Sequence, residues 1–122
     1  MPHNGALGER YAAEYLQERG YTILETNFHT RFGEIDIIAQ RGDILAFVEV
    51  KTRAATMLGS PEAAVTPTKQ KKLITTALHY LQAHPADLQP RFDVVAITTA
   101  SKMAFKVLDI VHLTDAFEAA PQ

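Results

Sequence analysis

Two acidic residues and a lysine are embedded in segments of apolar residues that would form strands. Asp36 lies inside an Ile-Asp-Ile-Ile-Ala run, and Glu49 follows after twelve intervening residues, two positions before Lys51. Residues two apart share one face of a strand, so Glu49 and Lys51 would point to the same side. Hard divalent cations prefer carboxylate and carbonyl oxygens. The pattern therefore predicts a site for Mg²⁺ or Mn²⁺, with Asp36, Glu49 and the backbone carbonyl of Val50 as ligands.

The chemistry expected of such a site is hydrolysis of a phosphodiester bond. The cation would polarise a phosphoryl oxygen, and the Lys51 ammonium would orient the attacking water or stabilise charge in the transition state. The alternative is a solvated strand edge with an ordinary Glu–Lys pair, which is common for an isolated E-x-K pattern. Asp36 favours the site, because a carboxylate inside an apolar run is costly unless something compensates its charge.

A β-hairpin is expected to bring these side chains together. Strands are predicted at 33–39 and 44–51, with an Arg-Gly-Asp turn at 41–43 between them. Pairing across this turn would place Asp36 close to Glu49. Alternation divides the first strand into two faces, with Glu34, Asp36 and Ile38 on one and Ile35, Ile37 and Ala39 on the other.

The rest of the chain predicts helices and strands around this hairpin. Apolar residues at helical spacing favour a helix at 5–19 that ends at Gly20. Thr66 and Pro67 form a typical helix start, and this second helix is expected to run to about Ala83. The remaining expectations are strands at 21–28, 92–98 and 105–111, loops at 54–66 and 86–91, and a short helix around Asp115. The order α-β-β-β-α-β-β indicates one α/β domain, residues 1–122, with a central mixed sheet flanked by helices.

Three further polar residues are candidates for the same site. Glu9 lies near the start of the first helix on its apolar side, although most such glutamates are only favourable first-turn charges. Gln70 falls on the apolar side of the second helix, where a glutamine is either hydrogen-bonded in the core or part of a site. Glu34 shares the face of Asp36 and either supports the site or lies at the surface.

Basic residues that could contact nucleic acid lie in the middle of the chain. The segment from Arg31 to Lys72 has seven basic and five acidic residues, so it becomes locally positive if a cation neutralises some of the carboxylates. The candidates for phosphate contacts are Arg31, Arg53, Lys69 and Lys72, although solvated strand ends explain the two arginines equally well. A formal net charge of −2 and a pI of about 6.2 argue mildly against a protein coated in nucleic acid.

Composition removes several other classes of site. The chain has no cysteine, so disulfides, thiolate nucleophiles and cysteine–zinc sites are excluded. The five histidines lack metal-ligand spacing, and P-loop, dinucleotide-binding and serine-hydrolase motifs are absent. No apolar run is long enough to span a membrane, and the first residues have no apolar signal core. A cytoplasmic protein without a membrane partner is therefore expected.

The chain resembles a known family over nearly its whole length. The segments GERYAAEYL, NFHTRFGEIDIIA, FVEVKTR, TPTKQKKL and RFDVVAI are similar to those of the YraN-like bacterial proteins. These are classed with the PD-(D/E)xK, restriction-endonuclease-like superfamily, within which the chain looks most like archaeal Holliday junction resolvases. The resemblance implies an αβββαβ core, Mg²⁺-dependent cleavage of DNA, and a homodimer. It also implies residue roles, with Asp36 and Glu49 as metal ligands, Lys51 as the catalytic lysine, Glu9 as a helix-borne acid at the metal and Gln70 as an inward helix glutamine.

Two functional hypotheses follow, with a plainer third. The first is a metal-dependent nuclease that acts on DNA, with branched or damaged DNA as candidate substrates. The second is a catalytically silent module that keeps the nuclease fold and binds nucleic acid or a protein partner. The third is a structural domain in which these charges merely pair with one another.

Overall fold

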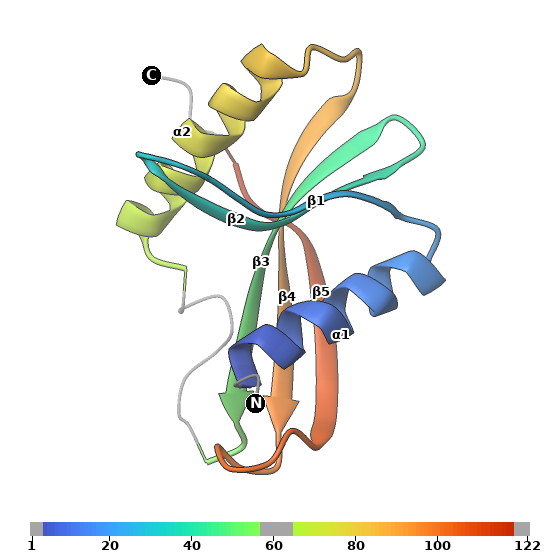
Figure 1. Cartoon of the computed structure of the whole chain (residues 1–122), viewed down its shortest axis with the longest axis vertical. Helices are drawn as coiled ribbons and strands as arrows, with labels where there is room; N and C mark the ends of the chain where they lie inside the picture. Colours follow the sequence, from blue (N-terminus) through green and yellow to red (C-terminus); the bar gives the residue numbers. More distant parts are fainter. Residues whose placement is uncertain (1–3, 57–64, 119–122) are drawn as a thin grey trace.

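The computed structural model describes residues 4–56 and 65–118, which form one five-stranded sheet with two helices (Figure 1). The elements are α1 (Asn4–Glu18), β1 (Thr22–Thr30), β2 (Gly33–Arg41), β3 (Ile44–Ala54), α2 (Pro67–Ala83), β4 (Gln89–Thr99) and β5 (Val107–Phe117). The strands lie in the order β1-β2-β3-β4-β5; β3 and β4 run parallel, and the other neighbouring pairs run antiparallel. The expected α/β fold with a mixed central sheet is confirmed and is consistent with a restriction-endonuclease-like core.

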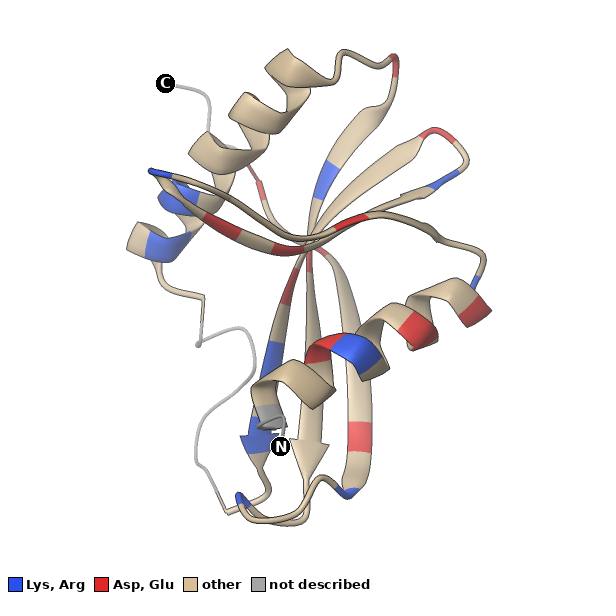
Figure 2. Cartoon of the chain, in the orientation of Figure 1, with Lys and Arg blue, Asp and Glu red and all other residues tan. Residues whose placement is uncertain are grey.

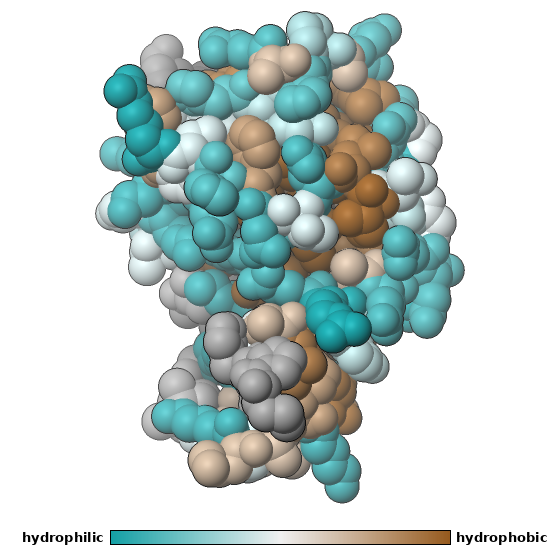
Figure 3. Space-filling model, in the orientation of Figure 1, coloured by the Kyte–Doolittle hydropathy of each residue, from teal (hydrophilic) through white to brown (hydrophobic). Residues whose placement is uncertain are grey.

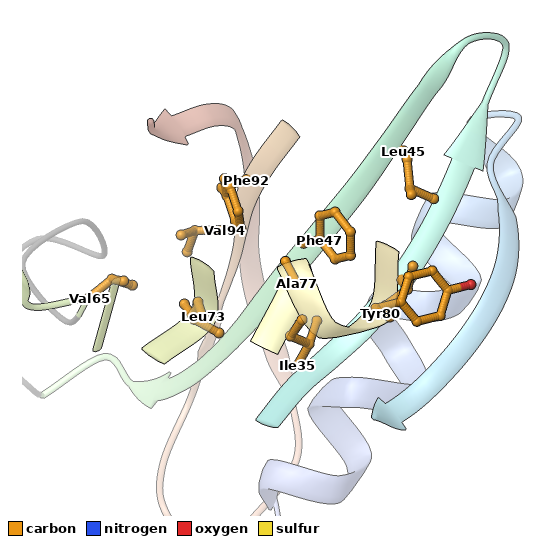
Figure 4. Close-up of a cluster of buried hydrophobic side chains, with 10 residues drawn as sticks. Ile35, Leu45, Phe47, Val65, Leu73, Ala77, Tyr80, Phe92 and Val94 are labelled. Carbon is orange, nitrogen blue, oxygen red and sulfur yellow. The ribbon is translucent and has the colours of Figure 1, made fainter. Parts of the chain in front are cut away.

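The two helices pack on opposite faces of the sheet, and the residues of β3 alternate between them. Leu16 of α1 packs in one buried cluster with Val48, whereas Leu73 of α2 packs in the other with Phe47 (Figure 4). The next residue of β3 on the Phe47 side is Glu49, because side chains alternate along a strand. Glu49 therefore faces α2.

The β2 strand changes neighbours along its length. It pairs with β3 over residues 37–41, whereas β1 accompanies it almost from end to end. Beyond this point Ile35 joins the α2-side cluster that contains Ile38, so the expectation that Ile35 shares a face with Ile37 is wrong. The physical reason is the divergence of β2 from β3, which turns Ile35 toward α2. Asp36 lies where the two strands separate.

The start of α2 and the end of α1 are formed by the residues that the sequence predicts. The Thr66 side chain accepts a hydrogen bond from the backbone N–H of Lys69 at 3.2 Å, and Pro67 opens α2. Gly20 follows α1 with a φ of 90°, a left-handed conformation that glycine adopts without steric cost. In the described parts of the chain, neither helix is long and apolar enough to cross a membrane.

The C-terminal part differs from the expectation. A helix is predicted around Asp115, but β5 continues through this residue to Phe117. Asp115 has a φ of 54°, and its backbone N–H donates a hydrogen bond at 3.0 Å to the buried carboxylate of Asp93. This acceptor lies in β4, so a contact with a distant segment keeps the irregular strand in the sheet. The predicted loop at 54–66 also begins later than expected, since β3 extends to Ala54, and residues 57–64 of it lie outside the described residues.

Candidate metal centre

The carboxyl groups of Asp36 and Glu49 meet in the interior where β2 and β3 separate. The two residues are only 6% and 4% exposed. Asp36 Oδ2 accepts a hydrogen bond at 2.8 Å from the backbone N–H of Val50. The Glu49 carboxyl lies close enough to act directly on the pKa of Asp36, so the predicted approach of these two side chains across the hairpin is confirmed.

Burial and the neighbouring acid both disfavour the ionised form of Asp36. Burial is the largest cause, and the hydrogen bond and charge of Glu49 add to it, so the pKa of Asp36 rises from 3.8 to about 8. Glu9 acts in the same direction, while the hydrogen bond from Val50 opposes the change. A bound cation would reverse this balance, because it stabilises both carboxylates in their charged form. Strongly shifted acids of this kind cluster at functional sites.

Lys69 of α2 supplies a positive charge to this pair. Its Nζ lies 3.0 Å from Glu49 Oε2, so the two side chains form an ion pair. Glu49 Oε2 is buried and accepts no hydrogen bond of good geometry. Burial works against the charged form of Lys69. The contact with Glu49 and the charges of Asp36 and Glu34 outweigh burial, and the pKa of Lys69 lies above its usual value. The sequence predicts Lys69 as a phosphate contact, and the structure places its ammonium on Glu49.

Lys51 and Glu9 are the other two predicted site residues, and they lie on β3 and α1, respectively. Lys51 is half-buried and, by alternation along β3, faces the same side as Glu49. Glu9 is half-buried on α1 and close enough to raise the pKa of Asp36. Within residues 4–56 and 65–118, no three Asp, Glu or His side chains converge as a ligand set. The roles of Lys51 as catalytic lysine and Glu9 as ligand stay predictions.

Gln70 and Glu34 lie at the margin of the centre. The Gln70 side-chain amide donates a hydrogen bond at 3.0 Å to the carbonyl of Val65. This bond holds the amide at the start of α2. Glu34 is exposed, and its charge still contributes to the environment of Lys69. The α2 side chain in contact with the carboxyl pair is therefore Lys69, one position before the predicted Gln70.

A close approach of α1 to β3 sets the position of Glu9. Gly8 is buried, and a Cβ added there would overlap the side-chain hydroxyl of Thr52. Glycine lets the helix axis come this near to the strand, because it has no Cβ. Its neighbour Glu9 is thereby held beside the sheet. The sequence offered no signal for this contact, since it joins segments far apart in the chain.

Basic residues lie in three segments near the strands that carry Asp36 and Glu49 (Figure 2). They come from the start of α2, the β1–β2 turn and the end of β3, and they are Lys69, Lys72, Arg31, Lys51 and Arg53. In Figure 3, hydrophilic side chains cover much of the visible surface, while an apolar strip lies over β1 and the β2–β3 hairpin. Cations around a carboxylate pair suit a polyanionic backbone that approaches a metal site.

An exposed aromatic residue in the β1–β2 turn was not predicted from the sequence. The Phe32 ring is 39% exposed and lies 4.7 Å from the His79 ring of α2, centroid to centroid. The guanidinium carbon of Arg31 lies 4.9 Å from the Phe32 centroid. The signal available in the sequence was an aromatic residue at a turn, next to an arginine, where no core position is expected.

A second buried carboxylate, Asp93 of β4, was also missed. Arg91 donates two hydrogen bonds of 2.8 Å to Asp93, and His112 Nε2 of β5 lies 2.8 Å from Asp93 Oδ2. Burial alone would raise the pKa of Asp93, but the hydrogen bonds from His112 and Arg91 outweigh it and lower the pKa. Asp93 therefore has strong partners, unlike Asp36, and we interpret it as a structural anchor between β4 and β5.

Known proteins similar to this chain share its length as well as its sequence. The profile of "Uncharacterised protein family UPF0102" matches residues 8–97, a segment that contains Glu9, Asp36, Glu49 and Lys51. A UPF0102 protein of Syntrophus aciditrophicus is 48% identical, with 95% of this chain and 89% of that protein covered. One from Syntrophomonas wolfei is 46% identical, with 93% and 96% covered. One from Geobacter sulfurreducens is also 46% identical, with 95% and 89% covered. This chain belongs to the UPF0102 family.

Proposed function

We propose that this protein is a metal-dependent nuclease that hydrolyses phosphodiester bonds in DNA. The observation that carries the proposal is the buried carboxyl pair of Asp36 and Glu49, on neighbouring strands and with the pKa of Asp36 raised to about 8. Lys51 follows Glu49 on the same face of β3. In a purely structural domain, two buried carboxyl groups side by side would only destabilise the fold. A metal site explains why both acids are buried together. The resemblance to the PD-(D/E)xK superfamily supports the same conclusion.

The side chains at this centre fit Mg²⁺ or Mn²⁺. Mg²⁺ usually binds one or two carboxylates, keeps several waters and shares the phosphate oxygens of its substrate. Asp36 and Glu49 supply two carboxylates, and Glu49 Oε2 is buried without a hydrogen bond. The Val50 carbonyl and Glu9 are the further candidate ligands. When bound, the cation would supply Lewis-acid activation of the phosphodiester.

The chain's own residues would position the substrate and the attacking water. The Lys51 ammonium would donate hydrogen bonds to that water or to the phosphate oxygen that gains charge. Arg31, Arg53, Lys69 and Lys72 would contact the phosphates that flank the reacting one. Branched or damaged DNA in the cytoplasm is the proposed substrate class. A homodimer would provide two sites for the two cuts that a branch requires.

A cleavage assay tests this function. The full chain would be incubated with four-way junctions, flaps, linear duplexes and single-stranded RNA, in Mg²⁺, Mn²⁺ or EDTA. We expect cleavage of DNA that requires the metal and is strongest on branched substrates. Lys51→Ala should lower the rate about 100-fold or more, in line with the loss of one transition-state donor.

The matched control is Lys106→Ala, which removes an exposed lysine from the connection between β4 and β5. This control should cleave at the wild-type rate. Cleavage that persists in Lys51→Ala would come from another site or a contaminant and would contradict the assignment of Lys51. If wild-type protein cuts none of these substrates in any metal, the nuclease proposal fails.

One observation favours a second candidate, a catalytically silent nucleic-acid-binding module. The ion pair between Lys69 and Glu49 gives one of the carboxylates a positive partner from the chain itself. Such a module would bind DNA with an affinity that falls steeply as salt rises, because phosphate contacts release counterions. Salt-sensitive binding without cleavage in Mg²⁺ or Mn²⁺ would support this second candidate over the first.

A further inference from the structure

We propose that Lys69 is a resident counterion of the carboxyl pair, which a divalent cation must displace in order to bind. Without metal, the ammonium neutralises Glu49. With metal bound, the released ammonium becomes available to a phosphate of the substrate. This inference rests on the proposed function, because it concerns the same carboxylates.

The two partners of the ion pair differ in their freedom to move. The Lys69 and Glu49 side chains are 43% and 5% exposed, respectively, and Nζ lies 3.0 Å from Oε2. Lys69 therefore reaches inward from the surface on a flexible four-carbon stem and can withdraw into solvent. Glu49 is fixed in β3 and cannot follow. A competitor for Oε2 would accordingly displace the lysine and leave the carboxylate in place.

The position of Lys69 in α2 is unfavourable for the helix itself. Lys69 is the third residue after the Thr66 cap, and the first turn of α2 has no acidic residue. A cation there is repelled by the positive end of the helix dipole, and acidic residues are preferred at such positions. The backbone N–H of Lys69 is bonded to the Thr66 side chain, which fixes where the lysine side chain begins. The ion pair with Glu49 offsets this unfavourable interaction with the helix dipole and explains a lysine at this position.

An ammonium and a divalent cation cannot both occupy the space next to Glu49 Oε2. The metal affinity of the wild-type protein is therefore reduced by the free energy needed to displace Lys69. Removal of the ammonium should raise the affinity. We expect a gain of about 5- to 100-fold, the usual range for coupling between two binding events.

The test is calorimetric titration of the full-length, metal-free chain with Mn²⁺, for wild type, Lys69→Met and Lys71→Met. Lys71 lies two residues further along α2 and is exposed, so its loss changes the net charge equally without touching Glu49. We expect tighter Mn²⁺ binding in Lys69→Met and binding within about twofold of wild type in Lys71→Met. Metal-free Lys69→Met should also melt at a lower temperature than Lys71→Met, since it lacks the partner of a buried acid.

The outcomes separate this inference from the proposed function. If wild type binds Mn²⁺ and Lys69→Met binds it equally or more weakly, the counterion role is overturned while the metal site stands. If neither protein binds Mn²⁺, both the inference and the proposed function fail. Should Lys69→Met not fold, Lys69→Gln provides the same comparison with a neutral polar side chain.

Discussion

Asp36→Asn is expected to make the metal-free protein more stable at pH 8, although it alters a buried residue of the proposed site. The wild-type carboxyl must either hold a proton or lie charged beside Glu49, because burial and Glu49 raise the pKa of Asp36 from 3.8 to about 8. Asparagine keeps an oxygen that can accept the Val50 hydrogen bond and removes the charge. The expected gain in the free energy of unfolding is on the order of 2 kcal/mol, as for other replacements of buried ionic groups.

The pH dependence of this effect has a definite sign. Between pH 4 and pH 8 the folded protein binds a proton at Asp36 that the unfolded chain has released. The contribution of Asp36 to stability is therefore fully present below about pH 4 and is lost as pH rises to about 8. Over this window the stability advantage of Asp36→Asn should grow with pH and then level off. Urea unfolding in EDTA at several pH values would measure it.

The matched control is Asp43→Asn in the exposed turn of the same hairpin. This change should leave the stability within about 0.5 kcal/mol of wild type at each pH. An Asp36→Asn protein that is less stable than wild type at pH 8 without metal would show that the charged carboxylate stabilises the fold. That result would remove the main observation behind the proposed site.

The second large effect is expected at Asp93, where truncation should destabilise the fold. Asp93→Ala would leave Arg91, His112 and the backbone N–H of Asp115 without their shared acceptor in the interior. The removal of one partner from a buried ionic network typically costs about 3–5 kcal/mol. Urea unfolding at neutral pH would measure the loss directly.

Asp109→Ala provides the comparison for this second prediction. Asp109 lies on β5 and is exposed, so its truncation should cost less than about 0.5 kcal/mol. A loss of under 1 kcal/mol at Asp93 would mean that Arg91 and His112 find other partners. The anchoring of β5 to β4 would then depend on the apolar clusters alone.

The local part of the structure could be predicted from the sequence. The Gly42 turn and the hairpin register, in which Ile37 pairs with Val48, bring Asp36 and Glu49 close together, and this signal acts over a short distance. The start of α2 followed in the same way from Thr66 and Pro67. The order of helices and strands was correct for this reason, since each element carries its own periodicity.

Features that depend on distant segments could not be predicted. Lys69 meets Glu49 only because α2 packs on the face of the sheet to which β3 directs this glutamate. Asp115 is a second example. Its local sequence is compatible with a helix, so the sequence predicts a helix there. Its contact with Asp93 in β4 instead keeps the segment in a strand. Tertiary contacts decide such positions over local propensity.

The most direct test of the central claim is calorimetric titration of the metal-free chain with Mg²⁺ and Mn²⁺. Wild type would be compared with the double variant Asp36→Asn, Glu49→Gln, in which both carboxylates become neutral amides of nearly the same size. We predict that wild type binds a divalent cation and that the double variant does not, while it remains folded and melts cooperatively. Equal binding by the two proteins, or no binding by wild type, would contradict the assignment of Asp36 and Glu49 as a metal centre.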